Sequence, residues 1–486
     1  MPATAAAAAA PARPHDAPAI PPLLSLALIG VQSFVILFVV PRPESITLAG
    51  WRLLAIFLGV IVALMLRPVA GGAAVLIGVT ITVLGGVLPI QKALASYGSP
   101  TLWQVMSAFF IARALINSGL ARRIALLFVR AMGHTSLGLG YSLIASDLVL
   151  ASAIPSNAAR VGGVILPITR TLAVIYKSLP GPTAALLGTF LMLAIYQGDI
   201  VACAMFYTGQ ASNPMGADLA RRTAAVSINW ATWLRAALAP ALVAVVAVPW
   251  VVYRLAPPEI RRTPEAAAMA RRELETMGAM RRDERIVLAV FVLVCLLWAT
   301  TSWHPIQSTT VGLLGAGLLL ATGALSWSDC VREHVGWDVF VWYGGLIGLG
   351  EALNEFGVTK VFAGWVAGHF AGWSWPALMA GIVLIYFYTH YAFASLTAHF
   401  IALYAPFLAV LVAAGAPAPL AAYALAFYTN LSASLTHYGT VHSPIVFAAG
   451  YVSPGLWWRV GLLISLVNLA IWTAVGLAWW KLLGLW

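Results

Sequence analysis

Two long apolar stretches of this sequence are each interrupted near the middle by a short polar segment. Ile154–Arg160 interrupts residues 137–176, and Phe393–His399 interrupts residues 375–413. Each apolar arm has the composition of a membrane-spanning segment but is short, which is typical of a re-entrant hairpin. Non-helical backbone at membrane depth is tolerated where it is buried in protein or lines a wet cavity. Each polar tip is therefore a candidate binding site.

The composition assigns the chain to the membrane proteins. Of its 486 residues 61% are hydrophobic and 9% charged, which is too little polar surface for a soluble protein. The net charge of +11 comes mostly from short loops between apolar stretches, so it indicates topology and a lipid bilayer as partner rather than nucleic acid. We predict an all-α polytopic fold with about 11 transmembrane segments, each crossing roughly 30 Å of hydrocarbon.

The order of apolar and polar segments divides the chain into five parts. An Ala- and Pro-rich tail at 1–22, predicted to be disordered, precedes a first transmembrane helix and loop at 23–50. Two repeats follow at 51–253 and 286–486, joined by a linker at 254–285 with eight Arg and six acidic residues. We expect this linker to be an amphipathic helix on the cytoplasmic surface. Each repeat holds a hairpin, at 137–176 or 375–413, and then a broken helix, at 183–229 or 417–452.

The two repeats are related by a nearly constant offset. Gly78 corresponds to Gly315 at an offset of 237 residues, and Ser156 corresponds to Ser395 at 239. Five membrane elements per repeat is an odd number, so the repeats have opposite orientations. We therefore expect one hairpin to enter from each side of the membrane, with both tips near the midplane.

The chemistry of the tips favours an anion. The helix after each tip presents unpaired amides and a partial positive charge, and Ser156, Asn157, Ser395 and Thr397 add neutral hydrogen-bonding groups. Arg160 adds a cation at one tip, and His399 adds a group that becomes a cation when protonated. No Asp or Glu occurs between Phe356 and Trp486, where a cation pathway would be expected to use them.

Other interpretations of the polar residues are weaker. His390, His399, His437 and His442 have spacings that match no common zinc pattern, and the three cysteines are scattered, so we predict no metal and no cofactor. Asp147 and Asp199 lie in apolar segments, where pairing with an Arg is favoured over a proton relay. Hydroxyl and amide side chains in membrane helices also often bond only to a neighbouring helix.

The motifs at 156–168, 393–399 and 435–440 resemble the divalent anion–sodium symporter family, and within it the bacterial citrate/succinate antiporters and the plastid 2-oxoglutarate/malate translocators. The resemblance covers nearly the whole chain after the tail. It implies a homodimer in which a transport domain moves as an elevator against a scaffold domain. It also implies substrate contacts from both tips and from the two helix breaks, namely Asn213, Pro214, Thr436, Gly439 and Thr440.

Two tip positions differ from the sodium-coupled members of that family. Ala158 stands where the family usually has Thr, and Leu396 stands where sodium-coupled relatives have Asn. Both changes remove oxygen ligands, while Arg160 and His399 are nearby in sequence. We therefore expect these two side chains to supply charge compensation in place of sodium.

We conclude from the sequence that the protein is a secondary transporter of dicarboxylates or tricarboxylates, of the malate, 2-oxoglutarate, succinate and citrate class, working by sodium-independent exchange. A sodium- or proton-coupled symporter is the main alternative. A membrane-embedded enzyme is a remote one, because no nucleophile–base or metal constellation can be assembled. We expect the protein to lie in the inner (plasma) membrane of a bacterium, with its N-terminus cytoplasmic and its C-terminus external.

The topology can be tested with single-cysteine variants in which the three native cysteines are replaced. Because the basic linker is expected to be cytoplasmic, a Glu273→Cys variant should not react with a membrane-impermeant reagent in intact cells. A Trp486→Cys variant should react. Modification of the cysteine at 273 in intact cells would overturn this orientation.

Overall fold

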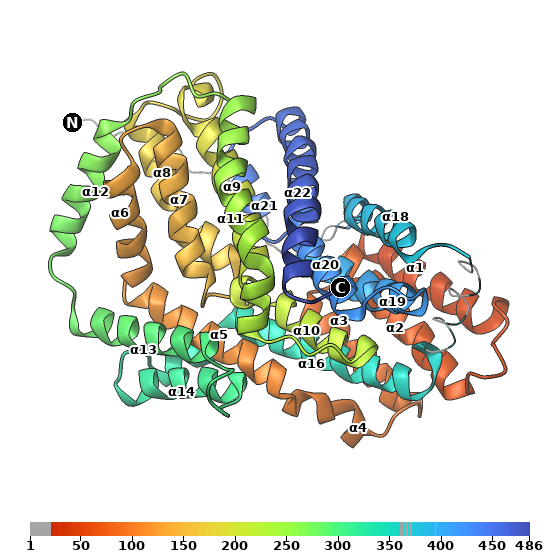
Figure 1. Cartoon of the computed structure of the whole chain (residues 1–486). Helices are drawn as coiled ribbons and strands as arrows, with labels where there is room; N and C mark the ends of the chain where they lie inside the picture. The colour runs from red at the N-terminus through yellow and green to blue at the C-terminus, as the bar shows by residue number, and fades with distance from the viewer. Residues whose placement is uncertain (1–20, 360, 362–363, 365–367, 369–371, 394) are drawn as a thin grey trace.

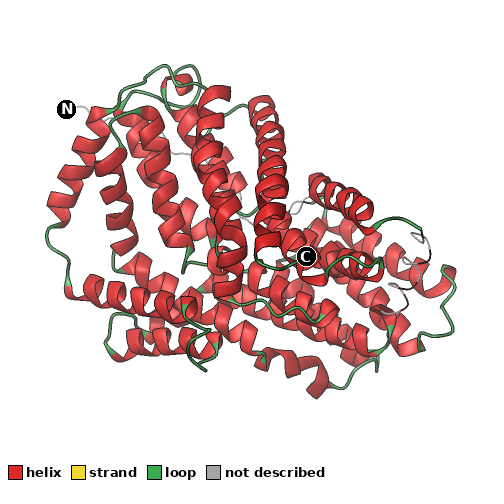
Figure 2. Cartoon of the chain, viewed as in Figure 1, coloured by secondary structure: helices red, strands yellow, loops and turns green. Residues whose placement is uncertain are grey.

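The computed structural model describes residues 21–359, 361, 364, 368, 372–393 and 395–486, so nearly all of the tail predicted at 1–22 lies outside the described residues. Within them the chain forms helices joined by loops, and no strand is present (Figure 2). The predicted all-α fold is confirmed. Four of the short helical turns are 3-10 helices, and two longer segments, Val35–Val39 and Ala158–Ile165, are π-helices.

Local sequence signals mark the starts of several of the first six α-helices. Thr47 caps the second of them through its side chain, Pro lies in the first turn of α1 and α5, and α5 and α6 meet at a bend of 64°. The bend falls at Gly119, whose φ of +86° is easily adopted only by glycine. The helices are α1 Pro22–Phe34, α2 Leu48–Leu66, α3 Gly71–Leu84, α4 Ile90–Ala95, α5 Pro100–Asn117 and α6 Leu120–Met132.

The first hairpin consists of α7 and, after a tip, the π-helix η3 continued by α8. The helix that follows it stops at Met205 and resumes at Ser212, in the region where the sequence predicts a broken helix. These elements are α7 Ser136–Ala151, η3 Ala158–Ile165, α8 Leu166–Ile175, α9 Gly188–Met205, α10 Ser212–Ala224 and α11 Trp230–Leu255. The linker contains α12, Pro264–Met277.

The second half has the same order of elements. Its hairpin is formed by α18 and α19, and its broken helix by α20 and the short α21. The bounds are α13 Arg282–Ala299, α14 Ser308–Ala321, α15 Trp327–Val331, α16 His334–Glu355, α18 Trp375–Tyr388, α19 Leu396–Ala413, α20 Ala418–Ser432, α21 Ser443–Phe447 and α22 Pro454–Leu482.

Many of these helices have the length and composition of membrane spans. Among the described residues seven helices pass this test, or eight if the bent pair α5–α6 counts as one span. Three shorter apolar helices are α7, which belongs to the first hairpin, and α3 and α14, which occupy corresponding places in the two halves. The protein is therefore an integral membrane protein, while the predicted count of about 11 segments remains a prediction.

Helix α9 forms the centre of the structure. Nearly all of its residues are buried, because α7, α8, α11, α20 and α22 pack around it. Figure 1 shows α7, α8, α9, α11 and α22 side by side, with α5, α13 and α14 lying across one end of this bundle. Any polar side chain on α9 must therefore find its partners inside the protein.

Ion pairs connect helices at the edge of this bundle. Arg123 on α6 forms a buried bidentate pair with Glu284 on α13, with N–O distances of 2.9 and 3.1 Å. Arg222, which the sequence does not place, bonds to Asp218 on its own helix α10 and to Glu351 on α16. Arg222 thus joins the first broken helix to a helix that packs on α3 and α5.

Close packing of α22 on the second helix break depends on Gly461. A Cβ atom at this position would lie 2.4 Å from the carbonyl oxygen of Ser434 and 2.8 Å from that of Leu435. Both atoms belong to the backbone, so neither can rotate away. The absence of a side chain at 461 allows the break to rest directly on α22.

This contact predicts that Gly461→Ala destabilises the protein. Overpacking against rigid backbone should lower the free energy of unfolding by about 1–3 kcal/mol, measured as a lower midpoint of thermal unfolding in detergent. Gly455→Ala on the same helix is the control, because nothing lies within 4 Å of its Cβ position. Equal midpoints for the two variants would show that α22 does not press on the break.

Candidate substrate site at the hairpin tips and helix breaks

At the first tip, backbone amides donate hydrogen bonds to side chains of the tip itself. The Ser156 hydroxyl oxygen accepts a bond from the Ala159 amide at 3.2 Å, and the Asn157 side-chain oxygen accepts one from the Ala158 amide at 2.9 Å. Ser156 is buried and Asn157 is half-buried. Both side chains act here as acceptors, so their hydroxyl and amide hydrogens are not used in these bonds.

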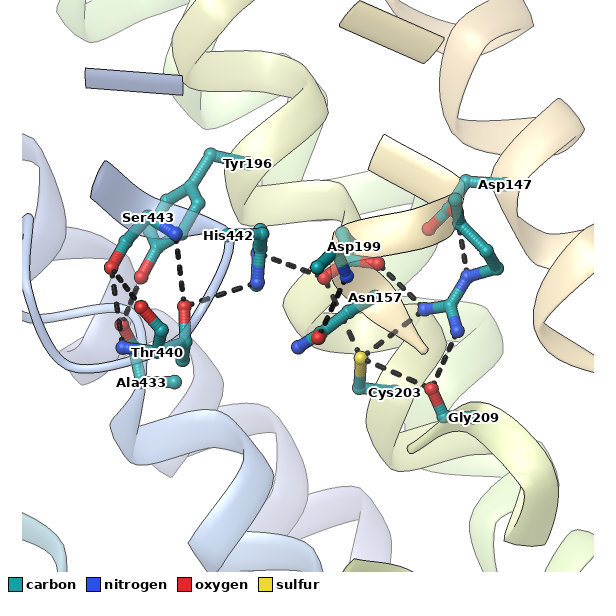
Figure 3. A network of polar contacts seen from close by, with 12 residues as sticks. Asp147, Asn157, Tyr196, Asp199, Cys203, Gly209, Ala433, Thr440, His442 and Ser443 are labelled. Atoms are coloured by element: carbon teal, nitrogen blue, oxygen red, sulfur yellow. Dashed lines mark hydrogen bonds and ion pairs between the residues drawn. The ribbon is translucent and has the colours of Figure 1, made fainter. Parts of the chain in front are cut away.

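Arg160 is the most fully bonded residue of this tip. Its side chain is completely buried, and its guanidinium donates to oxygens from three separate segments. Figure 3 shows Asp147, Asp199, Cys203 and Gly209 around the place where these bonds meet. The acceptors are Asp147 Oδ1 at 2.9 Å, the Ile154 carbonyl at 2.7 Å, the Gly209 carbonyl at 2.6 Å, Asp199 Oδ1 at 2.6 Å and Cys203 Sγ at 3.3 Å.

The two buried acids of the first repeat therefore share one arginine. The sequence predicts an Arg partner for each, and both pair with Arg160. The second oxygen of Asp199 lies 2.9 Å from Nε2 of His442, which belongs to the second helix break. The cluster thus joins the first hairpin, α9 and the second repeat.

The first break is stabilised by Asn213. Its amide nitrogen donates to the carbonyls of Cys203 and Phe206 at 2.8 and 2.9 Å, which satisfies carbonyls at the end of α9. Its oxygen accepts a bond of 2.9 Å from Asn430 on α20. Pro214 lies in the first turn of α10, where a residue without an N–H is tolerated.

The second break contains both satisfied and unsatisfied polar groups. Thr440 and Ser443 exchange hydrogen bonds, because each hydroxyl oxygen accepts from the backbone amide of the other at 3.2 Å. Thr436 is buried, and its hydroxyl has no hydrogen-bond partner among the described residues. A Cβ atom at Gly439 would lie 2.5 Å from Nε2 of His390, so this position must be glycine for the ring to approach.

The second tip has the same capping chemistry as the first. Ser395 caps α19 by accepting from the Ala398 amide at 3.3 Å, and Thr397 follows it half-buried; Ala394 lies outside the described residues. His399 is buried, and its Nε2 lies 2.8 Å from the Tyr386 carbonyl and 3.2 Å from the Thr389 hydroxyl. Its Nδ1 has no hydrogen-bond partner in the described part of the chain.

The second break links the Arg160 cluster to the neighbourhood of the second tip. On one side His442 lies against Asp199, which pairs with Arg160. On the other side Gly439 lies against His390, whose ring is 5.1 Å from that of His399. The segment 433–442 thus connects Arg160 of the first hairpin to His399 of the second through Asp199 and His390.

Several residues of this region are not predicted as site residues from the sequence. Tyr196, Asp199 and Cys203 lie on one face of α9, at spacings of three and four residues that indicate a polar stripe on an apolar helix. The hydroxyl of Tyr196 donates to the Ala433 carbonyl at 2.6 Å, which ties α9 to the second break. Asn430 and the buried pair His390 and His442 complete this set, and the sequence spacings of these two histidines indicate neither a metal site nor another role.

A buried polar site between two hairpins and two broken membrane helices is the arrangement of a membrane transporter. Residues 23–486 match the model of the sodium:sulfate symporter transmembrane region, so the chain belongs to that family. It is a transporter rather than an enzyme.

Three relatives whose names state a substrate are similar to this chain over 85% or more of their own length. The chain is 41% identical over 476 residues to dicarboxylate transporter 1, chloroplastic, of Arabidopsis thaliana, covering 97% of this chain and 85% of that one. It is 40% identical to the putative malate transporter YflS of Bacillus subtilis (94% and 96% covered) and 32% identical to the citrate/succinate antiporter of Escherichia coli (93% and 96%).

A solved structure supports the fold alone. The YdaH transporter of Alcanivorax borkumensis aligns with a TM-score of 0.51 over 83% of this chain and 88% of that one, at 13% identity. At this identity the likeness concerns the arrangement of helices and not the substrate.

Proposed function

We propose that the protein exchanges one dicarboxylate or tricarboxylate for another across the membrane without sodium. The substrate class is supported by the names of the relatives, which include dicarboxylate, malate and citrate/succinate carriers. The proposed contacts are Ser156 and Asn157 at one tip, Ser395 and Thr397 at the other, and the breaks at Asn213, Pro214, Thr436, Gly439 and Thr440. Helix starts and neutral donors at these positions suit carboxylate groups.

The observation that carries sodium independence is the position of the Arg160 guanidinium. Four oxygen atoms surround it at 2.6–2.9 Å, two from carboxylates and two from backbone carbonyls. Unwound backbone carbonyls are the groups with which transporters bind sodium, and here a covalently attached cation holds them. A cation that is part of the chain cannot be released with the substrate.

Exchange requires that the empty carrier return slowly. A fixed charge on Arg160 could by itself oppose that return, but Asp147 and Asp199 pair with Arg160 in the structure. Slow return of the empty carrier is better explained by buried polar groups that have no hydrogen-bond partner among the described residues, such as the Thr436 hydroxyl and Nδ1 of His399. Two such groups cost about 2–6 kcal/mol, so empty return slows by roughly one to four orders of magnitude.

We also propose the elevator movement and the homodimer that the family resemblance implies. The hairpins and broken helices would move together, because the hydrogen bond between Asn213 and Asn430 joins the two breaks. Their movement would be relative to α5 and α16, and the ion pair between Arg222 and Glu351 crosses that boundary. The alternative is a sodium- or proton-coupled symporter. The exchange measurement described below distinguishes it from an exchanger.

A first test removes the amide of the first tip. Asn157→Ala eliminates a hydrogen bond to a charged carboxylate and should weaken malate binding by about 1.5–3 kcal/mol, which is roughly ten- to a hundredfold in Kd. Binding to purified protein is the measurement. Asn117→Ala is the control, because Asn117 is exposed and bonds to Asp329 away from the tips. Unchanged affinity in the Asn157 variant would place the site elsewhere.

A second test measures exchange in liposomes containing the purified protein. Labelled malate should enter vesicles loaded with unlabelled malate at least tenfold faster than empty vesicles, because empty return is slow. Removal of sodium from both sides should leave this rate unchanged. Uptake into empty vesicles that depends on an inward sodium gradient would replace exchange by symport.

A further inference from the structure

His390 is a buried polar residue whose side chain makes no hydrogen bond within the described part of the chain. It lies in the 3-10 turn η6, Thr389–Ala392, between α18 and the second tip. The residue is 0% exposed, and neither Nδ1 nor Nε2 has a hydrogen-bond partner among the described residues. A polar group buried in this way has lost its water and gained nothing in exchange, so it lowers stability. The stability of the fold therefore does not explain a histidine at this position.

The first hairpin has an apolar residue at the corresponding place. At the offset of 239 residues that relates Ser395 to Ser156, His390 corresponds to Ala151 at the end of α7. Ala151 is also fully buried. A hairpin of this kind can therefore be built with an apolar side chain just before its tip.

His304 shows how a histidine with a structural role is bonded in this chain. It lies in the loop between α13 and α14, and both of its ring nitrogens are used. Nε2 lies 2.9 Å from the Leu297 carbonyl oxygen, and Nδ1 accepts a hydrogen bond of 3.2 Å from the Ile306 amide. His390 has the opposite pattern, with both nitrogens unused.

Nε2 of His390 faces the same space as a second polar atom without a partner. A Cβ atom at Gly439 would lie 2.5 Å from Nε2 of His390 and 2.7 Å from Oγ1 of Thr436. The Thr436 hydroxyl is also buried and has no partner among the described residues. Glycine at 439 leaves the space beside both atoms free of a side chain. Two potential donors thus converge on one place beside the second break.

A carboxylate oxygen would satisfy both groups at once. A neutral imidazole carries a hydrogen on one nitrogen, the threonine hydroxyl carries another, and one carboxylate oxygen has lone pairs for two such donors. Hydrogen bonds to a charged acceptor are about twice as strong as those between neutral groups. The histidine needs no charge of its own for this role.

We propose that His390 is a substrate-binding residue, and that its Nε2–H and the Thr436 hydroxyl donate to the same carboxylate of a bound dicarboxylate. The proposal rests on the proposed function, which counts Thr436 and Gly439 among the substrate contacts. It adds a donor that belongs to neither tip. It also places one carboxylate beside Gly439, where the packing of α18 on α20 brings η6 against the second break (Figure 1).

The test measures malate binding and thermal unfolding in purified variants. His390→Leu removes both ring nitrogens, so calorimetry should show malate binding roughly ten- to a hundredfold more weakly. Without malate, this variant should unfold at the same temperature as wild type or higher, because apolar atoms replace unbonded polar ones. His390→Gln keeps an N–H near the position of Nε2, and it should bind malate roughly fivefold more tightly than His390→Leu, or better.

His304→Leu is the matched control and should behave in the opposite way. It loses two satisfied hydrogen bonds, so its unfolding midpoint should fall while its affinity for malate stays at the wild-type value. Wild-type affinity in His390→Leu would overturn the inference, as would equal affinities of the Leu and Gln variants. A lower midpoint of His390→Leu without malate would also overturn it, because His390 would then be structural. Failure of wild type to bind malate would instead overturn the proposed function.

Discussion

The structure depends on one guanidinium. Arg160 is fully buried, and its hydrogen bonds hold together the first hairpin, the break between α9 and α10, and α9 itself. Non-helical backbone inside a membrane protein needs partners for its freed carbonyls, and Arg160 supplies them for Ile154 and Gly209. Without this side chain the Asp147 carboxylate and the Ile154 carbonyl would lose their hydrogen-bond donor, and Asp199 would keep only its contacts with Cys203 and His442, so the hairpin tip would be strongly destabilised.

The surroundings of the two tips differ in which buried polar atoms are hydrogen-bonded. At the first tip Arg160 gives all its donors to protein acceptors, and Asp147 Oδ2 is a buried oxygen without a hydrogen-bond partner among the described residues. In the second break and around the second tip, Thr436, His390 and His399 keep buried polar atoms without partners in the described part of the chain. In the proposed site, the first tip would therefore act mainly as a rigid support, and the second tip with the second break would supply the groups that gain most from a bound carboxylate.

The sequence predicted the helical fold and the hairpins because these follow from local patterns. The polar interruptions, the proline at 155 and the glycine at 209 show where helices stop, and the acids at 147 and 199 demand a cation. The partner of each acid was not predictable, because pairing depends on which segments pack together. His442 and Asp199 are separated by half of the chain length, and the π-helix after the first tip follows no sequence pattern.

The hydrogen bond between Asn213 and Asn430 joins the two helix breaks with a single amide–amide contact of 2.9 Å. Both side chains are buried, and the bonds from Tyr196 and Gln197 to the carbonyls of residues 433 and 434 add two more connections. A frame braced in this way keeps the two helix breaks at a set distance. If the substrate bridges them as proposed, the frame would select dicarboxylates by the spacing between their two charged ends, and hence by the length of the carbon chain.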